Sequence, residues 1–397
     1  ISTLWYWEMG SILNYVFESD VDTPNGKHFC NSGPFRQIII NKNYSTSNNL
    51  QIKEGFKNLL WFEVNHPDKF LDYIISNKDI FNLLERDDFK IVFSMIADPS
   101  YQRWYDENYE KILNSLNNKV IFIDTNVAIK QNIFKFHFFL EEIVGNVDNI
   151  FTSDKYQEEL KYKNEKIELN DLDKFRFKKF LCFNRIIQKY HRFKLFLDWG
   201  TNDFSDSYFS FLNKYESGGA ISPQKVKELE TEYGLDYCKD MYKKLPIELD
   251  TQQAKRNNNI VEWNRTHNNF KKELFVNSCI NIVTETSFED NELFISEKVL
   301  KPIIGYQPFI VFGGLNYLKE LKNLGFKTFS SVWDESYDEI EDFELRYDAI
   351  IKLILDLNKK TIEELNEIYK SVKNICIYNR KHLNKIKINS LENILKI

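Results

Sequence analysis

The chain has 397 residues, of which 43% are hydrophobic and 28% are charged. This length favours about two domains, and the composition excludes an intrinsically disordered chain. A formal net charge of −6 argues against a general nucleic-acid-binding protein, which carries a basic surplus or stripe. A local basic pocket is compatible with this overall balance.

The five cysteines are scattered, without the spacing of a zinc site or a disulfide framework. We therefore expect reduced thiols and a cytoplasmic protein. No segment approaches the roughly 20 apolar residues that span a bilayer, so no transmembrane segment is predicted. Residues 1–5 lack a Met and the basic-then-apolar pattern of a signal peptide.

Residues 1–165 are predicted to form a first α/β lobe. The expected elements are a short strand at 36–40, buried strands at 90–95 and 120–123, helices at 101–116 and 134–144, and a short strand near 149–152. Strands that alternate with helices of this length are typical of βαβ units and a mostly parallel sheet.

A strongly charged segment at 153–176 follows, and its mixed Lys, Asp and Glu residues are typical of a solvated linker or surface helix. We expect the boundary between two lobes here, with a second α/β lobe at 175–347. A long helical pattern beyond it predicts a C-terminal helical segment at 348–397.

The second lobe has the clearest pattern. The expected elements are a strand at 180–183, a helix that begins at 192–197, charged helical residues at 223–245, a strand at 280–284, a helix at 296–304, a strand at 309–312, a helix at 315–324 and a strand at 326–329. Residues 280–329 thus follow a β-α-β-α-β order, which indicates a Rossmann-like half. Ligands bind beyond the carboxyl ends of strands in such sheets, so functional residues should follow strands.

Ser296, Glu297 and Lys298 lie at the predicted start of the helix 296–304. If Ser296 caps this helix, its backbone N–H groups and dipole form an anion site. Lys298, and Lys301 one turn on, add positive charge where a cation alone is unfavourable by roughly 0.3–1 kcal/mol. This placement is favourable if a nucleotide diphosphate binds, and Glu297 then offers a carboxylate to ribose hydroxyls. An ordinary surface helix explains the same residues.

The surrounding motifs support the first interpretation. They are Val283-Thr284-Glu285-Thr286-Ser287-Phe288, Ile295-Ser296-Glu297-Lys298, Lys301-Pro302-Ile303, Pro308-Phe309-Ile310 and Gly325-Phe326-Lys327-Thr328-Phe329. Together they resemble the donor half of the α1,3-fucosyltransferase family and of related viral and bacterial glycosyltransferases. That family has Thr where this chain has Ser296, a change that keeps the cap. The resemblance implies that Glu297 binds the ribose and Lys298 the diphosphate of a nucleotide.

A second match lies upstream, where the strand 180–183 is followed by Asn184, Arg185 and then Arg192. It resembles the opening strand of the family's donor lobe, in which an Arg several residues after an Asn neutralises the donor diphosphate. The resemblance assigns this role to Arg192, and a guanidinium suits it because it stays charged and binds phosphate in a bidentate way. Asn184 and Arg185 are expected to face the donor.

The resemblance covers residues 175–345, and the N-terminal lobe shows no convincing family match. Two α/β lobes with a C-terminal helical segment suggest the GT-B architecture, in which two Rossmann-like lobes bind substrates in the cleft between them. Lys301-Pro302 and Gly325–Phe329 belong more to the viral and bacterial relatives than to true fucosyltransferases.

Three carboxylates are further candidates. Asp98 and Asp124 each end a predicted strand of the first lobe, and an inverting transfer needs such a base to take a proton from the attacking hydroxyl. Asp98 is favoured, although acidic residues at strand ends are also ordinary turn formers. Glu285 follows the strand 280–284 and is a candidate for binding the base, the ribose or the sugar, or is simply a polar strand end.

A metal site is not predicted. Asp20 and Asp22 resemble the Asp-x-Asp motif with which another glycosyltransferase fold holds a divalent ion, but turn chemistry at Thr23-Pro24-Asn25-Gly26 explains them. The sequence lacks the Walker, dinucleotide and nucleophile-elbow motifs, so an ATPase, a dehydrogenase or a hydrolase is not favoured. The acidic loop 333–338 has two interpretations. Its aromatic side chains stack on a base or sugar, or its charges form a solvated rim.

We therefore expect an inverting, metal-independent glycosyltransferase without a cofactor. Its predicted partners are a nucleotide-sugar donor, for example a GDP-linked one, and a glycan acceptor. Two alternatives stay open: a non-catalytic nucleotide- or carbohydrate-binding domain of a larger assembly, and a metal-dependent transferase that uses Asp20 and Asp22.

Overall fold

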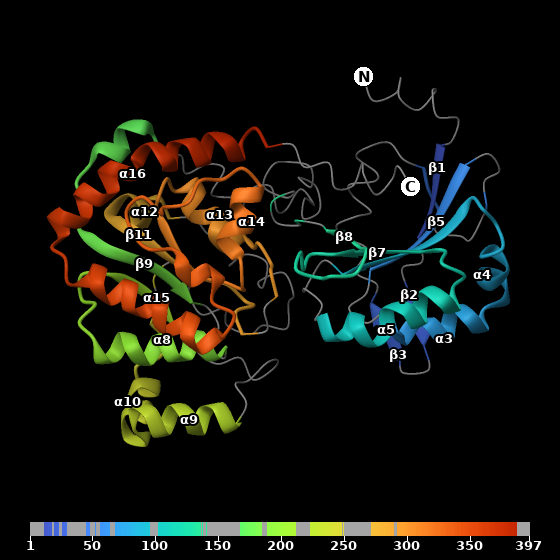
Figure 1. Cartoon of the computed structure of the whole chain (residues 1–397), viewed down its shortest axis with the longest axis horizontal. Coiled ribbons are helices and arrows are strands. Elements are labelled where there is room, and N and C mark those ends of the chain that lie inside the picture. Colours follow the sequence, from blue (N-terminus) through green and yellow to red (C-terminus); the bar gives the residue numbers. More distant parts are fainter. Residues whose placement is uncertain are drawn as a thin grey trace. The chain divides into compact units, whose positions relative to one another are not determined.

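The computed structural model divides into two compact units, Ile1–Ser153 with Lys387–Ile397, and Asp154–Ile386. Each unit contains a parallel sheet with helices (Figure 1), so the mixed α/β class is confirmed. The structure describes residues 12–17, 20–23, 26–29, 45–47, 52, 56–63, 68–95, 102–135, 137, 140, 167–184, 189–211, 223–247, 249, 271–289 and 292–386.

The first unit is built on a six-stranded sheet with the order β4-β1-β5-β6-β7-β8. Its strands, all parallel, are β1 (Ile12–Phe17), β4 (Ser45–Ser47), β5 (Phe56–Glu63), β6 (Phe89–Met95), β7 (Val120–Asp124) and β8 (Phe134–Lys135). A separate antiparallel pair consists of β2 (Asp20–Thr23) and β3 (Gly26–Phe29).

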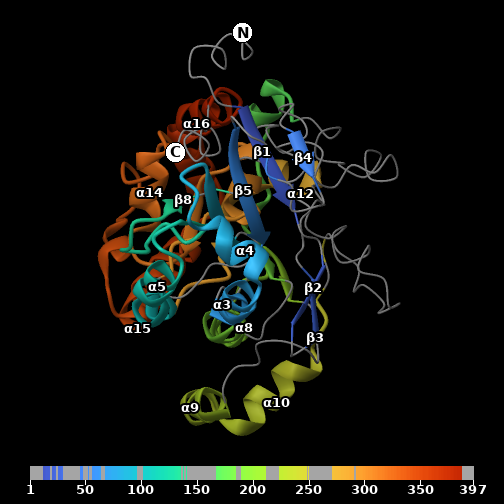
Figure 2. The ribbon, with the colours of Figure 1, turned by 90° about the vertical axis from the view of Figure 1, so that its right-hand side faces the viewer.

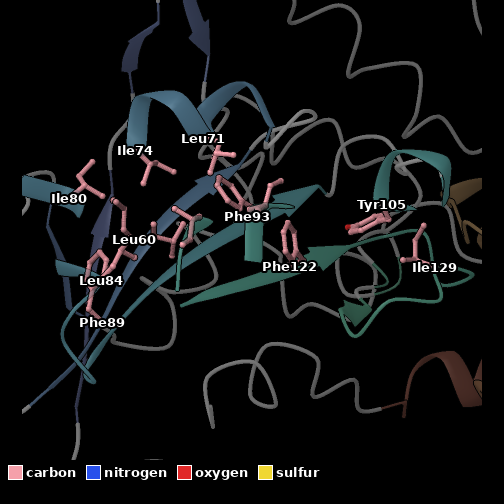
Figure 3. Close-up of a cluster of buried hydrophobic side chains, with 13 residues drawn as sticks. Leu60, Leu71, Ile74, Ile80, Leu84, Phe89, Phe93, Tyr105, Phe122 and Ile129 are labelled. Atoms are coloured by element: carbon pink, nitrogen blue, oxygen red, sulfur yellow. The ribbon is translucent and has the colours of Figure 1, made fainter. Parts of the chain in front are cut away.

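The core of the first unit lies between the sheet and three helices. These are α3 (Asp68–Ser76), α4 (Lys78–Leu83) and α5 (Gln102–Ser115). Figure 3 shows the cluster, which joins Leu60 and Phe93 of the strands to Leu71 of α3 and Tyr105 of α5. Val92, the strand neighbour of Phe93, is buried as well. A strand of a parallel sheet is buried on both faces, which explains its continuous apolar run.

The second unit contains a four-stranded parallel sheet with the order β10-β9-β11-β12. Its strands are β9 (Lys178–Asn184), β10 (Tyr208–Phe211), β11 (Ser278–Thr284) and β12 (Phe309–Phe312). The helical elements are η2 (Leu169–Asp173), α8 (Tyr190–Thr201), α9 (Pro223–Tyr233), α10 (Leu235–Lys243), α12 (Lys272–Asn277), α13 (Glu297–Ile304), α14 (Tyr317–Asn323), η3 (Ser336–Glu339), α15 (Phe343–Asn358) and α16 (Ile362–Leu383).

The helices of this unit cover both faces of its sheet. Figure 1 shows α8 and α15 on one side of β9, with α12, α13 and α16 on the other, and α16 contacts β9, β11 and α13. The pair α9 and α10 packs on α8, on the side away from the sheet (Figure 2). This two-sided covering is typical of doubly wound α/β sheets.

The strand order of the second unit contains one reversal of direction. The chain leads from β9 through α8 to β10 on one side, and from β11 through α13 to β12 on the other. The neighbouring strands β9 and β11 are therefore followed by connections that diverge. Their carboxyl ends form a topological switch point, the position at which open α/β sheets bind ligands.

Two predicted elements are wrong. Phe326–Phe329 is not a strand: the N–H and C=O groups of Lys327 bond to the side chain of Asn379 in α16, and the N–H of Phe329 donates to Glu335. The helix expected at 134–144 does not begin at Phe134, because Phe134–Lys135 extends the sheet as β8. The strands predicted at 36–40 and near 149–152 lie outside the described residues.

Two expectations from composition concern the described residues only. Within these ranges, no helix is both long and apolar enough to pass through a bilayer. Cys182, Cys238, Cys279 and Cys376 are free and buried, in agreement with the expected reduced thiols, whereas Cys30 lies in the part of the chain that the structure does not describe.

Candidate functional site

Buried polar side chains join the strands at the switch point. The hydroxyl of Thr284, the last residue of β11, donates to Oδ1 of Asn184, the last residue of β9, at 2.6 Å. The N–H group of Asn184 donates to Oγ of Ser210 in β10 at 3.3 Å. All three residues are buried, so the predicted residue Asn184 ties three neighbouring strands together at their carboxyl ends.

Arg192 lies in the first turn of α8, directly at this switch point. Its Nη2 donates to the main-chain oxygens of Thr284 and Glu285, both at 2.9 Å, and only 5% of the residue is exposed. Burial lowers the pKa of Arg192, and the nearby carboxylates of Glu285 and Glu297 oppose this effect. A second cation, Lys189, precedes the same helix. Two cations at a helix N-terminus are unfavourable unless an anion joins them.

Glu285 is fully buried and its carboxylate lies among hydroxyl groups. Oε1 accepts hydrogen bonds from the Tyr317 hydroxyl at 2.5 Å and from the Ser296 N–H at 3.3 Å, and Oε2 accepts one from the Ser296 hydroxyl at 2.5 Å. Burial and the charge of Glu285 hold the pKa of Tyr317 well above its usual value, so this phenol keeps its proton. The residue predicted to touch a ligand is thus bonded to the starts of two helices.

Ser296 is the N-cap of α13, as predicted. Its Oγ accepts hydrogen bonds from the N–H and from Nζ of Lys298, both at 3.2 Å. The same amine lies 3.2 Å from Oε1 of Glu297 and 3.9 Å from Oε2 of Glu285. The Lys298 side chain remains 26% exposed. Arg192 and Lys298 therefore both converge on Glu285, one at its main-chain oxygen and the other beside its carboxylate.

His191, which was not predicted as a site residue, directly precedes Arg192 in the first turn of α8. Its Nε2 is 3.0 Å from the main-chain oxygen of Glu285, and its Nδ1 is 3.6 Å from Oε1 of Glu289. Burial lowers the pKa of His191 to about 4. Burial alone would raise the pKa of Glu289, but His191 and the amine of Lys225, 3.0 Å away, outweigh it and lower this pKa to about 2. Glu289 is therefore a charged carboxylate with the Lys225 amine as its cationic partner.

The missed residues have weak signals in the sequence. His191 directly precedes Arg192, and Tyr317 follows the Gly313-Gly314 turn after β12. Gly313 is required there, because a Cβ atom would lie 2.6 Å from the Tyr317 ring. A glycine just after a strand and a few residues before a tyrosine was therefore the signal in the sequence for a buried Tyr317.

The structure shows fewer contacts between the other predicted donor residues and the switch point. Lys301 lies one turn along α13, with Nζ 5.7 Å from the centre of the Phe183 ring. Arg185 lies outside the described residues. The structure therefore adds a position for Lys301 and leaves the prediction for Arg185 as it stood.

The two candidate bases belong to the first unit, and only one is described. Asp124 is buried at the end of β7, where Oδ2 accepts a hydrogen bond from the Tyr105 hydroxyl at 3.0 Å and Oδ1 accepts one from the Asn126 N–H at 2.7 Å. This carboxylate holds the turn after β7 to α5. Asp98 lies outside the described ranges.

Asp20 and Asp22, the ligands of the alternative metal hypothesis, lie in β2 of the antiparallel pair. Among the residues that the structure describes, no group of three or more His, Cys, Asp or Glu side chains is arranged to hold a metal ion. The side chains of Asp20 and Asp22 lie outside this description, so the Asp-x-Asp hypothesis stays a prediction.

The acidic loop 333–338 is largely buried, although Asp334 is exposed. Trp333 and Tyr337 are buried. The Asp338 carboxylate accepts the N–H groups of Leu318 and Lys319, at 2.8 and 3.0 Å, and so caps α14. The sequence could not show this, because the capped helix lies about 20 residues upstream.

Comparisons with known proteins identify no family for this chain. No protein-family model matches it, and no curated protein matches it at a significant level. A functional assignment therefore depends on the motifs in the sequence and on the geometry at the switch point of the second unit.

Proposed function

We propose that the chain is a glycosyltransferase that transfers a sugar from a nucleotide-sugar donor, for example a GDP-linked one, to a glycan acceptor. In this proposal the two α/β units have the GT-B arrangement, and the second unit binds the donor. The observation that carries the proposal is the convergence of Arg192 and Lys298 on Glu285 at the switch point between β9 and β11.

The donor diphosphate would bind to Arg192, Lys298 and the N-terminus of α13. The contact between Lys298 and Glu297 is partly exposed, and such pairs contribute about 0–1 kcal/mol. A diphosphate carries more negative charge than one carboxylate and would also contact Arg192 and the helix end, so it attracts the amine more strongly. Exchange of Glu297 for phosphate is therefore favourable, and it leaves the Glu297 carboxylate to accept hydrogen bonds from the ribose.

In the proposed reaction an acceptor hydroxyl attacks the anomeric carbon as the bond to the diphosphate oxygen breaks. The departing diphosphate takes the bonding electrons, and the two cations stabilise its charge without a metal ion. A carboxylate takes the hydroxyl proton. Because both Asp124 oxygens already accept hydrogen bonds, we assign the base to Asp98: Asp98→Asn should abolish transfer but keep nucleotide affinity, and an active Asp98→Asn enzyme rules this assignment out.

Isothermal titration calorimetry with GDP and UDP tests the donor site. We expect the wild type to bind one of them, and Lys298→Ala and Arg192→Met to weaken the affinity by about 10-fold to 100-fold, because each removes a charge-assisted contact. Lys370→Ala, in an exposed pair with Glu367 on α16, is the matched control and should bind normally. Unchanged affinity in Lys298→Ala would show that the site is wrongly placed.

Turnover with a panel of nucleotide sugars separates an enzyme from a binding protein. Transfer or slow hydrolysis of the donor supports the proposal. Binding without either reaction would identify a non-catalytic nucleotide-binding domain, and loss of transfer in a chelator would favour the metal-dependent alternative.

A further inference from the structure

Glu285 contacts the starts of three helices of the second unit. Its main-chain oxygen accepts a hydrogen bond from Arg192 and lies 3.0 Å from Nε2 of His191, both in α8. Its carboxylate accepts hydrogen bonds from Ser296, the N-cap of α13, and from Tyr317, the first residue of α14. Glu285 itself follows β11, so one residue fixes the elements that surround the switch point.

The contact with Ser296 also sets the position of Lys298. A hydroxyl group has one proton to donate and two lone pairs that accept. The Ser296 hydroxyl donates to Glu285 and accepts hydrogen bonds from the N–H and from Nζ of Lys298. Its capacity is therefore filled, and the direction of its proton decides that its lone pairs face the Lys298 amine.

We propose that Glu285 is a positioning residue for the diphosphate site. Its main-chain oxygen holds Arg192, and its carboxylate holds Ser296 and, through it, Lys298. A diphosphate then meets both cations already in place. The inference rests on the proposed function, but it gives Glu285 a role that does not require contact with the donor.

Glutamine cannot replace Glu285 without disturbing this arrangement. One carboxylate oxygen faces the Ser296 hydroxyl, while the other faces the Ser296 N–H and the Tyr317 hydroxyl. An amide nitrogen in the second position meets the Ser296 N–H, which is a donor. In the first position it meets a hydroxyl whose lone pairs are used by Lys298. Either orientation of Glu285→Gln must move Ser296 or release the Lys298 amine.

A second buried carboxylate provides matched controls. Asp198 in α8 accepts hydrogen bonds from the Tyr233 and Tyr347 hydroxyls, at 2.7 and 2.5 Å. Asp198→Asn and Tyr347→Phe therefore repeat the chemistry of Glu285→Gln and Tyr317→Phe at a position that does not touch Arg192, Ser296 or Lys298 in any described contact. All four variants are expected to lower the thermal midpoint.

The experiment measures the affinity of each variant for GDP, UDP and inorganic pyrophosphate by calorimetry, together with its thermal midpoint. We expect Glu285→Gln to weaken binding about 10-fold, as the loss of a supporting contact does at other sites, and Tyr317→Phe about 3-fold. Both control variants should keep wild-type affinity. Tyr317→Phe keeps the test decisive if Glu285→Gln does not fold.

The outcomes separate the inference from the proposed function. If the wild type binds none of the three ligands, the proposed donor site is wrong. If the wild type binds but Glu285→Gln and Tyr317→Phe bind equally well, the site stands and the positioning role is overturned. A loss of affinity in the controls that equals the loss in the site variants also overturns it, because general destabilisation would then explain the result.

Discussion

Two connections of the second unit have the same plan but different contacts at the start of the helix. In both, a strand leads into the start of a helix: β11 into α13, and β12 into α14. The start of α14 is filled by the Asp338 carboxylate, which accepts two of its N–H groups. The start of α13 has the neutral cap Ser296, whose N–H and hydroxyl donate to Glu285, and its first turn holds both Glu297 and Lys298. The positive end of a helix attracts an anion. At α14 both oxygens of one carboxylate bond helix N–H groups, whereas at α13 the carboxylates of Glu285 and Glu297 also lie beside the Lys298 amine.

The proposed function gives these two helix starts different roles. A carboxylate at the N-terminus satisfies the backbone and stabilises the fold. A cation in the first turn is unfavourable on its own. Lys298 lies beside Glu285 and Glu297, and in the proposed function a diphosphate takes the place of the Glu297 contact. The start of α8 likewise holds the cations Lys189 and Arg192 and lies across the switch point from α13.

Acid should destabilise the fold through His191 at the switch point, and this is the largest effect that we expect. Burial lowers the pKa of His191 to about 4, whereas unfolded His titrates near 6.5. Between these values only the unfolded chain binds the proton, so its free energy falls relative to the folded state as the pH falls. The stability contributed by neutral His191 is present above about pH 6.5 and is lost towards pH 4, in total ~3 kcal/mol.

Urea unfolding at several pH values between 4 and 7 measures this loss. His191→Gln removes the titrating group but keeps an amide donor for the main-chain oxygen of Glu285, so its unfolding free energy should vary less over the same range. Glu289, with a pKa lowered to about 2, loses its contribution only below about pH 4.5. If wild type and His191→Gln show the same pH dependence, His191 is not buried in its neutral form.

Local patterns were sufficient to predict the elements around the site. Ser296 was predicted as a cap, and β12 was predicted at 309–312, because caps, Gly and Pro act within a few residues. The strand expected at Phe326–Phe329 has the same apolar character. This prediction is wrong because the side chain of Asn379, 52 residues further on, bonds to the backbone groups of Lys327. A local pattern contains no information about such a partner.

The site shows the same limit. Arg192 and Lys298 were identified by their motifs, but the hydrogen bond between Thr284 and Asn184 joins residues 100 positions apart. The role of Glu285 depends in the same way on Tyr317, 32 positions away. These contacts exist because parallel strands bring their carboxyl ends to one edge. No single motif specifies the strand order that creates this edge.

Asp338→Asn should damage the fold without affecting the ligand site, and the expected loss is ~2 kcal/mol of unfolding free energy. The two carboxylate oxygens accept the N–H groups of Leu318 and Lys319. An asparagine can accept only one of them and places a donor against the other. Chemical denaturation measures the loss, and calorimetry with GDP or UDP should show wild-type affinity. A weakened affinity would mean that the two helix starts are coupled, and that the start of α14 also affects ligand binding.

Lys301→Ala should have the smallest effect, a loss of ~0.5 kcal/mol in binding free energy, or roughly twofold in affinity. Lys301 lies one turn beyond Lys298, about 5 Å further along α13, where the field of the helix end has faded and salt screens the remaining charge. The matched variant is Lys319→Ala in the first turn of α14, whose helix end already holds Asp338. We expect that variant to bind GDP or UDP like the wild type in calorimetry at low and high salt. If Lys319→Ala weakened binding more than Lys301→Ala, the ligand's anion would lie at α14, because only a nearby charge acts strongly through the solvent.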